Sequence, residues 1–115
     1  MRYYSKFGNK KYTIDGIEFD SKKESQRYCE LKMLEKAGKI QDLQLQVEFM
    51  LIPAQYRIVN GKNKCVERAC KYIADFVYTE NGKQIVEDAK GFRTDVYKLK
   101  KKLMLYKYDI RIREV

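Results

Sequence analysis

The chain lacks histidine and tryptophan altogether, and it contains a single proline, Pro53. Because histidine is the commonest general base, any catalysis must rely on carboxylates, lysine or metal-bound water. The three cysteines, Cys29, Cys65 and Cys70, show no CxxC spacing and offer at most three soft ligands, which argues against a zinc site. They are better explained as free thiols in a reducing compartment.

Long apolar runs are also missing from the sequence. No stretch is long enough to span a membrane, and no charged start followed by an apolar stretch indicates a signal peptide. We therefore expect a cytoplasmic protein with no membrane partner.

Positive charge, by contrast, is abundant. The 25 lysines and arginines against 16 acidic residues give a net charge of +9, which favours nucleic acid or another anionic partner. A length of 115 residues suits one domain with one modest core. The first residues mix basic and aromatic side chains, so we expect a basic flexible arm over residues 1–11 and a single domain over residues 12–115.

Turn and cap signals divide the first half of the chain. Asp15-Gly16 predicts a small leading hairpin. The capping box over residues 21–24 opens a helix that should end near Ala37, before a glycine. Residues 43–51 alternate apolar and polar side chains, which is typical of a strand.

The second half is less regular. Residues 54–70 are ambiguous, although Asn60-Gly61 could form a further hairpin turn. Thr94 is a plausible N-cap for a helix to about residue 106, whose expected core stripe is Val96, Leu99, Leu103 and Tyr106. Residues 110–115 suggest a last short strand. The sequence therefore predicts an α+β fold in the order helix, three antiparallel strands, helix, strand, with the helices covering one or both faces of the sheet.

The most informative pattern is the Asn81-Gly82 turn between two β-rich runs. If these two residues form the loop, Asp75 lies directly opposite Asp88, with Cβ atoms about 4.5–5.5 Å apart. Lys90 then shares the face of Asp88, because side chains alternate along a strand. Like charges directly opposite each other are destabilising, and a divalent metal is the simplest reason for them. Carboxylate oxygens suit Mg²⁺, which proteins hold through one or two carboxylates plus water and phosphate.

Further polar residues are candidates for the same site. Glu24 falls on the buried side of the first helix, where capping and a site role are both open. If a hairpin around Asn60-Gly61 ran unbroken, Gln46 would face Asp75, although bulges could intervene. One face of the second helix carries Lys98, Lys101 and Lys102. These lysines either are exposed to solvent or contact the phosphates of a nucleic acid.

The pattern of Glu24, Asp75 and Asp88-Ala89-Lys90, in this order of elements, resembles the PD-(D/E)xK nuclease superfamily. The resemblance spans roughly residues 12–115 and implies a restriction-endonuclease-like core in which these acids and Lys90 are catalytic. Gln46 matches the position of a site-proximal glutamine in many relatives. Residues 19–24, 72–76 and 86–92 are similar, more narrowly, to short phage and prophage proteins of bacterial hosts, thought to be endonucleases akin to Holliday junction resolvases. The departure is Ala74, where the superfamily often has proline.

The resemblance implies a Mg²⁺- or Mn²⁺-dependent DNA endonuclease, with branched or junction DNA among the expected substrates. Asp75 and Asp88 would hold the metal, with Glu24 bound directly or through water, while Lys90 would orient the water or stabilise the phosphate. One site cuts one strand at a time, so action on both strands predicts a two-fold homodimer.

Two alternatives lack catalysis. A small basic domain can bind nucleic acid without cutting it, and such a protein would keep its affinity after Asp88 is removed. A structural RNA-binding protein shares the charge, but it gives no reason for Asp75 to oppose Asp88.

Overall fold

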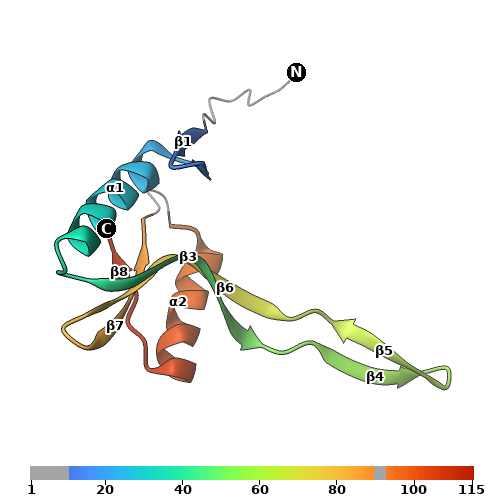
Figure 1. Cartoon of the computed structure of the whole chain (residues 1–115). Helices are drawn as coiled ribbons and strands as arrows, with labels where there is room; N and C mark the ends of the chain where they lie inside the picture. Colours follow the sequence, from blue (N-terminus) through green and yellow to red (C-terminus); the bar gives the residue numbers. More distant parts are fainter. Residues whose placement is uncertain (1–10, 90–92) are drawn as a thin grey trace.

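The computed structural model describes residues 11–89 and 93–115, so residues 1–10 of the predicted arm, and also Lys90, lie outside the described residues. Over the described residues the chain forms an α+β fold of two helices and three β-sheets (Figure 1). Helix α1 spans Lys22–Lys36 and helix α2 spans Asp95–Tyr108. The predicted α+β class is confirmed.

The largest sheet has four strands in the order β3-β6-β7-β8. Three of them are antiparallel: β3 (Gln41–Ile52), β6 (Cys70–Glu80) and β7 (Lys83–Asp88). The last strand, β8 (Arg113–Glu114), pairs parallel to β7, and α2 supplies the crossover that a parallel pair requires. The predicted order of helix, three antiparallel strands, helix and strand is therefore confirmed for this sheet, while residues 55–67 form a further hairpin between β3 and β6.

The β6–β7 hairpin turns at Asn81-Gly82, as predicted. Positive φ angles of 52° and 76° at these two residues are typical of the type I′ turn that suits the twist of a hairpin. The strands pair Phe76 with Glu87 and Glu80 with Lys83. This is the predicted register, and the pairing ends at Phe76 with Glu87, one residue short of Asp75 and Asp88.

Two smaller hairpins use the same turn chemistry. The leading hairpin pairs β1 (Tyr12–Ile14) with β2 (Ile17–Phe19) around Asp15-Gly16. The ambiguous residues 54–70 contain a second hairpin, in which β4 (Gln55–Val59) pairs with β5 (Lys62–Glu67).

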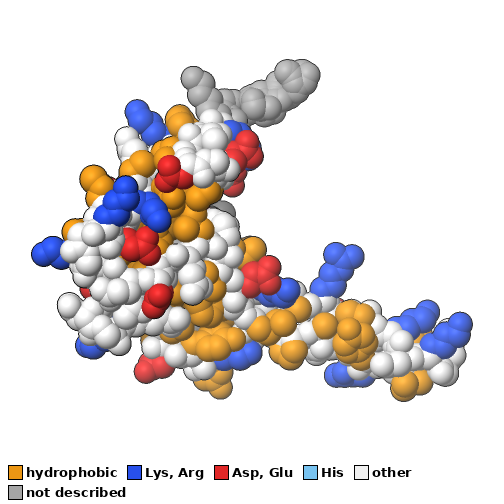
Figure 2. Space-filling view, viewed as in Figure 1, with side chains coloured by type: hydrophobic (Ala, Val, Ile, Leu, Met, Phe, Trp, Pro, Cys, Tyr) orange, Lys and Arg blue, Asp and Glu red, His pale blue; other side chains and the backbone are white. Residues whose placement is uncertain are grey.

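The β4–β5 ribbon continues β3 and β6 and projects away from the two helices (Figure 1). Figure 2 shows lysine and arginine side chains along this projecting part. The described chain extends 58 × 46 × 25 Å with a radius of gyration of 17.6 Å. A compact domain of this length would have a radius of gyration of about 13 Å, so the ribbon lies largely outside the packed body.

Both helices begin where the sequence predicts. Ser21 Oγ accepts a hydrogen bond from the Glu24 N–H at 3.1 Å, and Thr94 Oγ1 accepts one from the Tyr97 N–H at 3.1 Å. Each bond satisfies one of the N–H groups that a helix leaves unpaired in its first turn. Helix α1 ends at Lys36, with Ala37 as its C-cap, before Gly38 with a φ of 75°.

The predicted core stripe of α2 is wrong. Leu103 packs against the core, but the exposed fractions of the other three residues are high: 62% for Val96, 59% for Leu99 and 89% for Tyr106. Tyr97 and Met104 are buried instead. The Tyr97 hydroxyl donates to Glu114 at 2.8 Å, and this bond helps to lower the pKa of that carboxyl. A tyrosine that can both fill the core and reach a polar partner thus sets the orientation of the helix.

The helices lie on opposite faces of the sheet, each over its own hydrophobic cluster. Val77 belongs to the cluster with Tyr97 and Met104 of α2. Its neighbour Phe76 belongs to the cluster with α1, and adjacent residues of a strand point to opposite faces. The sheet is therefore covered on both sides.

Candidate active site

The middle of β3 is interrupted at Gln46, whose backbone φ is 55°. This left-handed conformation is uncommon for a non-glycine residue, costs about 1–3 kcal/mol, and tends to occur at functional sites. The side chains of β3 change faces here. Leu45 packs against the α1 cluster and Val47 against the α2 cluster, although residues two apart share a face in a regular strand.

Asp75 is the residue of β6 at the same level. The two strands pair Leu45 with Phe76 and Val47 with Ala74, so Gln46 and Asp75 face each other between these pairs. Strand β6 changes faces at this point too, because Ala74 belongs to the α2 cluster and Phe76 to the α1 cluster. The predicted alignment of Gln46 with Asp75 is found, and the register shifts of this pairing lie between Gln41 and Gln44 and between Met50 and Ile52.

The Gln46 amide joins two carboxylates that come from different elements. Its Nε2 donates to Glu24 Oε2 at 3.0 Å and lies 3.5 Å from Asp75 Oδ1. Glu24 enters from the first turn of α1, where its backbone N–H donates to Ser21 Oγ while its side chain joins this cluster. Both carboxylate residues are buried, with exposed fractions of 9% and 3%.

Asp88 lies beside this cluster at the end of β7. The Ala89 N–H, directly after it, donates to Asp75 Oδ2 at 2.8 Å. Asp88 itself is fully buried and accepts a hydrogen bond from the Tyr72 hydroxyl at 2.8 Å. Burial raises the pKa of Tyr72, and the negative charges of Asp88 and Asp75 raise it further. The hydroxyl therefore remains a donor at neutral pH.

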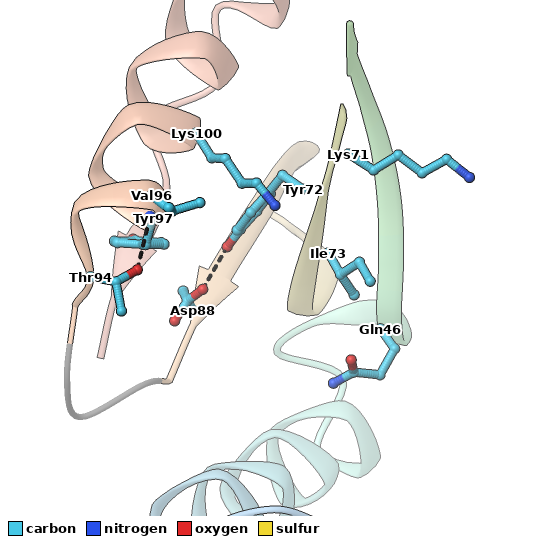
Figure 3. Close-up of a pocket in the computed structure, with 9 residues that line it drawn as sticks. All are labelled: Gln46, Lys71, Tyr72, Ile73, Asp88, Thr94, Val96, Tyr97 and Lys100. Carbon is cyan, nitrogen blue, oxygen red and sulfur yellow. Dashed lines mark hydrogen bonds between the residues drawn. The ribbon is translucent and has the colours of Figure 1, made fainter. Parts of the chain in front are cut away.

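A hollow of about 390 Å³ opens over Asp88 between β6 and α2 (Figure 3). Lys100 extends from α2 toward Tyr72 and Asp88, whereas Lys71 extends past β3 and its ammonium donates to Glu48 at 3.2 Å. The remaining lining residues are Gln46, Ile73, Thr94, Val96 and Tyr97. A buried carboxylate and a lysine thus border the same open space.

Gln46 also borders a second hollow, of about 280 Å³. Glu24 lines it together with residues 17–19 of the leading hairpin, Asp20 and Leu45. The side chain of Gln46 therefore connects a hollow that contains Glu24 with a hollow that contains Asp88.

Glu87 lies on the opposite face from Asp88, as the alternation of side chains predicts. Arg27 Nε and Nη2 donate to its two carboxylate oxygens at 2.9 and 2.6 Å, and the Tyr78 hydroxyl donates to it as well. Burial and the bond to Glu87 raise the pKa of Tyr78 to about 12. Glu87 is fully buried beneath α1, so its acidity serves a structural ion pair.

The lysines predicted to contact phosphates do not line the hollow over Asp88. Lys98, Lys101 and Lys102 line a separate hollow of about 390 Å³ with residues 110–112, and Lys101 pairs with Glu114 at 3.2 Å. Lys100, which is not among the residues predicted from the sequence, borders the hollow over Asp88 instead. The sequence could have indicated Lys100, because it lies one helical turn after Tyr97. That inference requires Tyr97, rather than Val96, to face the core.

Glu24, Asp75 and Asp88 offer hard oxygen donors. Among residues 11–89 and 93–115, no group of three or more His, Cys, Asp or Glu side chains is arranged to hold a metal ion. Mg²⁺ needs only one or two carboxylates and completes its shell with water and phosphate, so the donor chemistry fits this ion. Lys90 lies outside the described residues.

The remaining predictions concern thiols and membranes. Cys29, Cys65 and Cys70 are free cysteines, as expected. In the part of the chain that the structure describes, no helix is both long enough and apolar enough to cross a membrane.

One family model matches the chain over residues 4–114, and its description is "Protein of unknown function (DUF1064)". No curated protein and no solved structure matches the chain.

Proposed function

Since the chain belongs to the DUF1064 family, whose description names no activity, we propose from its site that it is a Mg²⁺- or Mn²⁺-dependent endonuclease that hydrolyses phosphodiester bonds in DNA. The observation that carries the proposal is the Gln46 amide held between Glu24 and Asp75, at a left-handed residue in mid-strand. Buried carboxylates and backbone strain both cost stability, and strain of this kind collects at functional sites. The sheet covered by α1 and α2 supports a restriction-endonuclease-like core.

In this proposal the metal, when bound, lowers the pKa of a water molecule and stabilises negative charge on the phosphate. Asp75 and Asp88 would hold it through their carboxylate oxygens, with Glu24 bound directly or through water. The chain's own contribution is to orient these ligands before substrate arrives. The Ala89 N–H and the Gln46 amide each contact one oxygen of Asp75, and the Tyr72 hydroxyl orients Asp88.

Lys100 is the proposed partner of the substrate phosphate. Its ammonium extends over the hollow that contains Asp88 (Figure 3), where it would offset the charge of a phosphate brought close to a carboxylate. The catalytic role of Lys90 and the phosphate-following role of Lys98, Lys101 and Lys102 remain predictions. So does the two-fold homodimer, which would place one site on each strand.

The second candidate is a basic protein that binds nucleic acid without cutting it. The net charge of +9 fits both functions equally. The carboxylates favour the nuclease, because a protein that only binds phosphates gains nothing from buried acids beside the phosphate-binding lysine.

The test is cleavage of linear, nicked, flapped and four-way DNA with Mg²⁺ or Mn²⁺, comparing wild type with Asp88→Asn. The amide keeps an acceptor for the Tyr72 hydroxyl but loses the charge that a metal needs, so cleavage should be abolished while the fold is retained. Asp42→Asn is the matched control, since Asp42 is exposed and asparagine tolerates its φ of 57°. Cleavage that persists in Asp88→Asn, or in the presence of EDTA, would eliminate the proposed mechanism.

A further inference from the structure

The β4–β5 ribbon has two chemically different faces. Directly paired residues share a face, and successive pairs alternate between faces. One face holds the pairs Arg57–Lys64 and Val59–Lys62, and the other holds Tyr56–Cys65 and Ile58–Asn63. The first face is therefore cationic and the second is largely apolar.

The fold does not account for this ribbon. Every residue of β4 and β5 is exposed, including 71% of Ile58 and 53% of Tyr56. A two-stranded hairpin alone is at best marginally stable in water. Arg57 facing Lys64 weakens it further, because like charges directly opposite each other repel. A self-repelling cationic face on an exposed ribbon is explained if an anionic partner neutralises it.

The charge of the segment supports the same partner. Residues 55–68 contain four basic residues, Arg57, Lys62, Lys64 and Arg68, against one acidic residue, Glu67. Figure 2 shows basic side chains standing out from the ribbon, clear of the packed body. A second copy of this chain would bring positive charge against positive charge on this face, whereas a phosphate backbone is complementary to it.

We propose that the β4–β5 ribbon is a DNA-binding arm whose cationic face lies against the phosphate backbone of a duplex. A two-stranded ribbon has dimensions that the major groove of B-DNA admits. The choice of DNA as ligand rests on the proposed function, but the arm itself would bind independently of catalysis.

The position of the arm gives the proposal a length scale. Arg57 lies eleven positions beyond Gln46 along β3 and β4, and Lys64 lies eleven positions before Asp75 along β5 and β6. At about 3.3 Å per residue, this separation is up to about 36 Å along the strands. One turn of B-DNA is about 34–36 Å, so the arm would contact the duplex about one turn from the cleaved bond.

The experiment measures DNA affinity by fluorescence anisotropy in the full chain carrying Asp88→Asn. Two blunt duplexes are compared, of about 8 and about 24 base pairs, which are shorter than one helical turn and longer than two. Adding Arg57→Thr and Lys64→Thr should weaken binding to the long duplex at least tenfold and leave the short one within twofold. Removing two phosphate contacts should also reduce the slope of log affinity against log salt by about two.

Two controls separate this role from general charge and from folding. Lys36→Thr with Lys39→Thr removes the same charge at the far end of α1 and should leave affinity within twofold. The threonine pair in the ribbon should not lower the unfolding temperature, because it removes a like-charge pair. An equal loss in the α1 control, or unchanged affinity in the ribbon variant, would overturn the proposal.

Sedimentation tests the alternative that the ribbon binds a second copy. If Tyr56→Ser with Ile58→Ser converts a dimer to a monomer while the threonine pair binds DNA as tightly as the parent, the arm is a dimer contact and the proposal fails. If DNA binding depends on the ribbon but wild type shows no metal-dependent cleavage, the proposed nuclease activity is refuted and the proposed DNA-binding arm is retained. If wild type cleaves DNA but the ribbon substitutions do not change DNA affinity, only the proposed DNA-binding arm is refuted.

Discussion

Gln46 and Asp75 face each other at the level where β3 and β6 both turn their side chains to the other face of the sheet, with 3.5 Å between Nε2 and Oδ1. This change of face has a consequence for the site. Glu24 comes from α1, on one side of the sheet, and Asp88 borders the hollow beneath α2, on the other. A regular sheet would separate these groups, whereas the interruption at Gln46 lets one side chain border both hollows.

The first prediction concerns the strained backbone of Gln46. Gln46→Gly should leave the free energy of unfolding unchanged or raised, because glycine adopts the left-handed conformation without strain. Cleavage should fall at least tenfold, since the amide that orients Glu24 and Asp75 is lost. Gln44→Gly, an exposed change two residues earlier in the same strand, should instead cost about 0.5–1 kcal/mol and leave cleavage intact. Urea unfolding measures the stability of each variant, and cleavage rates measure its activity. A loss of stability with intact cleavage in Gln46→Gly would show that Gln46 is merely structural.

The second prediction concerns the ion pair under α1. Arg27→Met should lower the free energy of unfolding by about 3–5 kcal/mol, because it leaves the fully buried Glu87 without its bidentate partner. Arg27→Met with Glu87→Met should recover most of that loss. A double-mutant cycle by urea unfolding measures the coupling. A cost of about 0–1 kcal/mol for the single change, as at a surface pair, would contradict this account.

A third prediction tests Tyr72 as a positioning residue. Tyr72→Phe removes the donor to Asp88, so the Mg²⁺ concentration for half-maximal cleavage should rise about 10–100-fold, as when other supporting partners of metal ligands are removed. The rate at saturating Mg²⁺ should change less. Tyr108→Phe, whose hydroxyl donates to the Met50 carbonyl on the exposed side, is the matched control. An unchanged Mg²⁺ dependence in Tyr72→Phe would remove this role.

The fourth prediction is a pH dependence of stability. The Leu43 N–H, and then Lys32, lower the pKa of Glu35 by bonding to its carboxylate, each at 3.1 Å. A carboxyl with a lowered pKa in the folded state binds fewer protons there than in the unfolded chain. Its stabilisation is therefore present above the unfolded pKa, near 4.5, and is lost as pH falls through the folded pKa.

Glu35→Gln should flatten the loss of stability below about pH 5, because the amide cannot titrate. The measurement is the urea midpoint of wild type and variant at neutral and acidic pH. Glu18→Gln, an exposed change in β2, serves as the control and should follow wild type. A wild-type and variant profile that run parallel would show that Glu35 contributes nothing to acid sensitivity.

Local chemistry explains which features were predictable from the sequence. The turn at Asn81-Gly82 depends on the backbone preferences of two adjacent residues, and the caps at Ser21 and Thr94 depend on bonds that span three residues. The same turn then sets the register of Phe76 with Glu87, the residues next to Asp75 and Asp88. Where structure follows from neighbours in the chain, the sequence by itself determined it.

Tertiary contacts decided the rest. Val96 and Tyr97 are equally plausible core residues in the sequence, and only the sheet beneath α2, with Glu114 in reach of a hydroxyl, selects Tyr97 and so brings Lys100 over Asp88. The left-handed conformation of Gln46 accompanies the change of face in both β3 and β6. Before and after this point, the side chains of each strand pack against different helices. A short stretch of sequence cannot predict this conformation, because Gln46 and Asp75 lie about thirty positions apart in the chain. They come together only in the folded sheet, when both of its faces are covered.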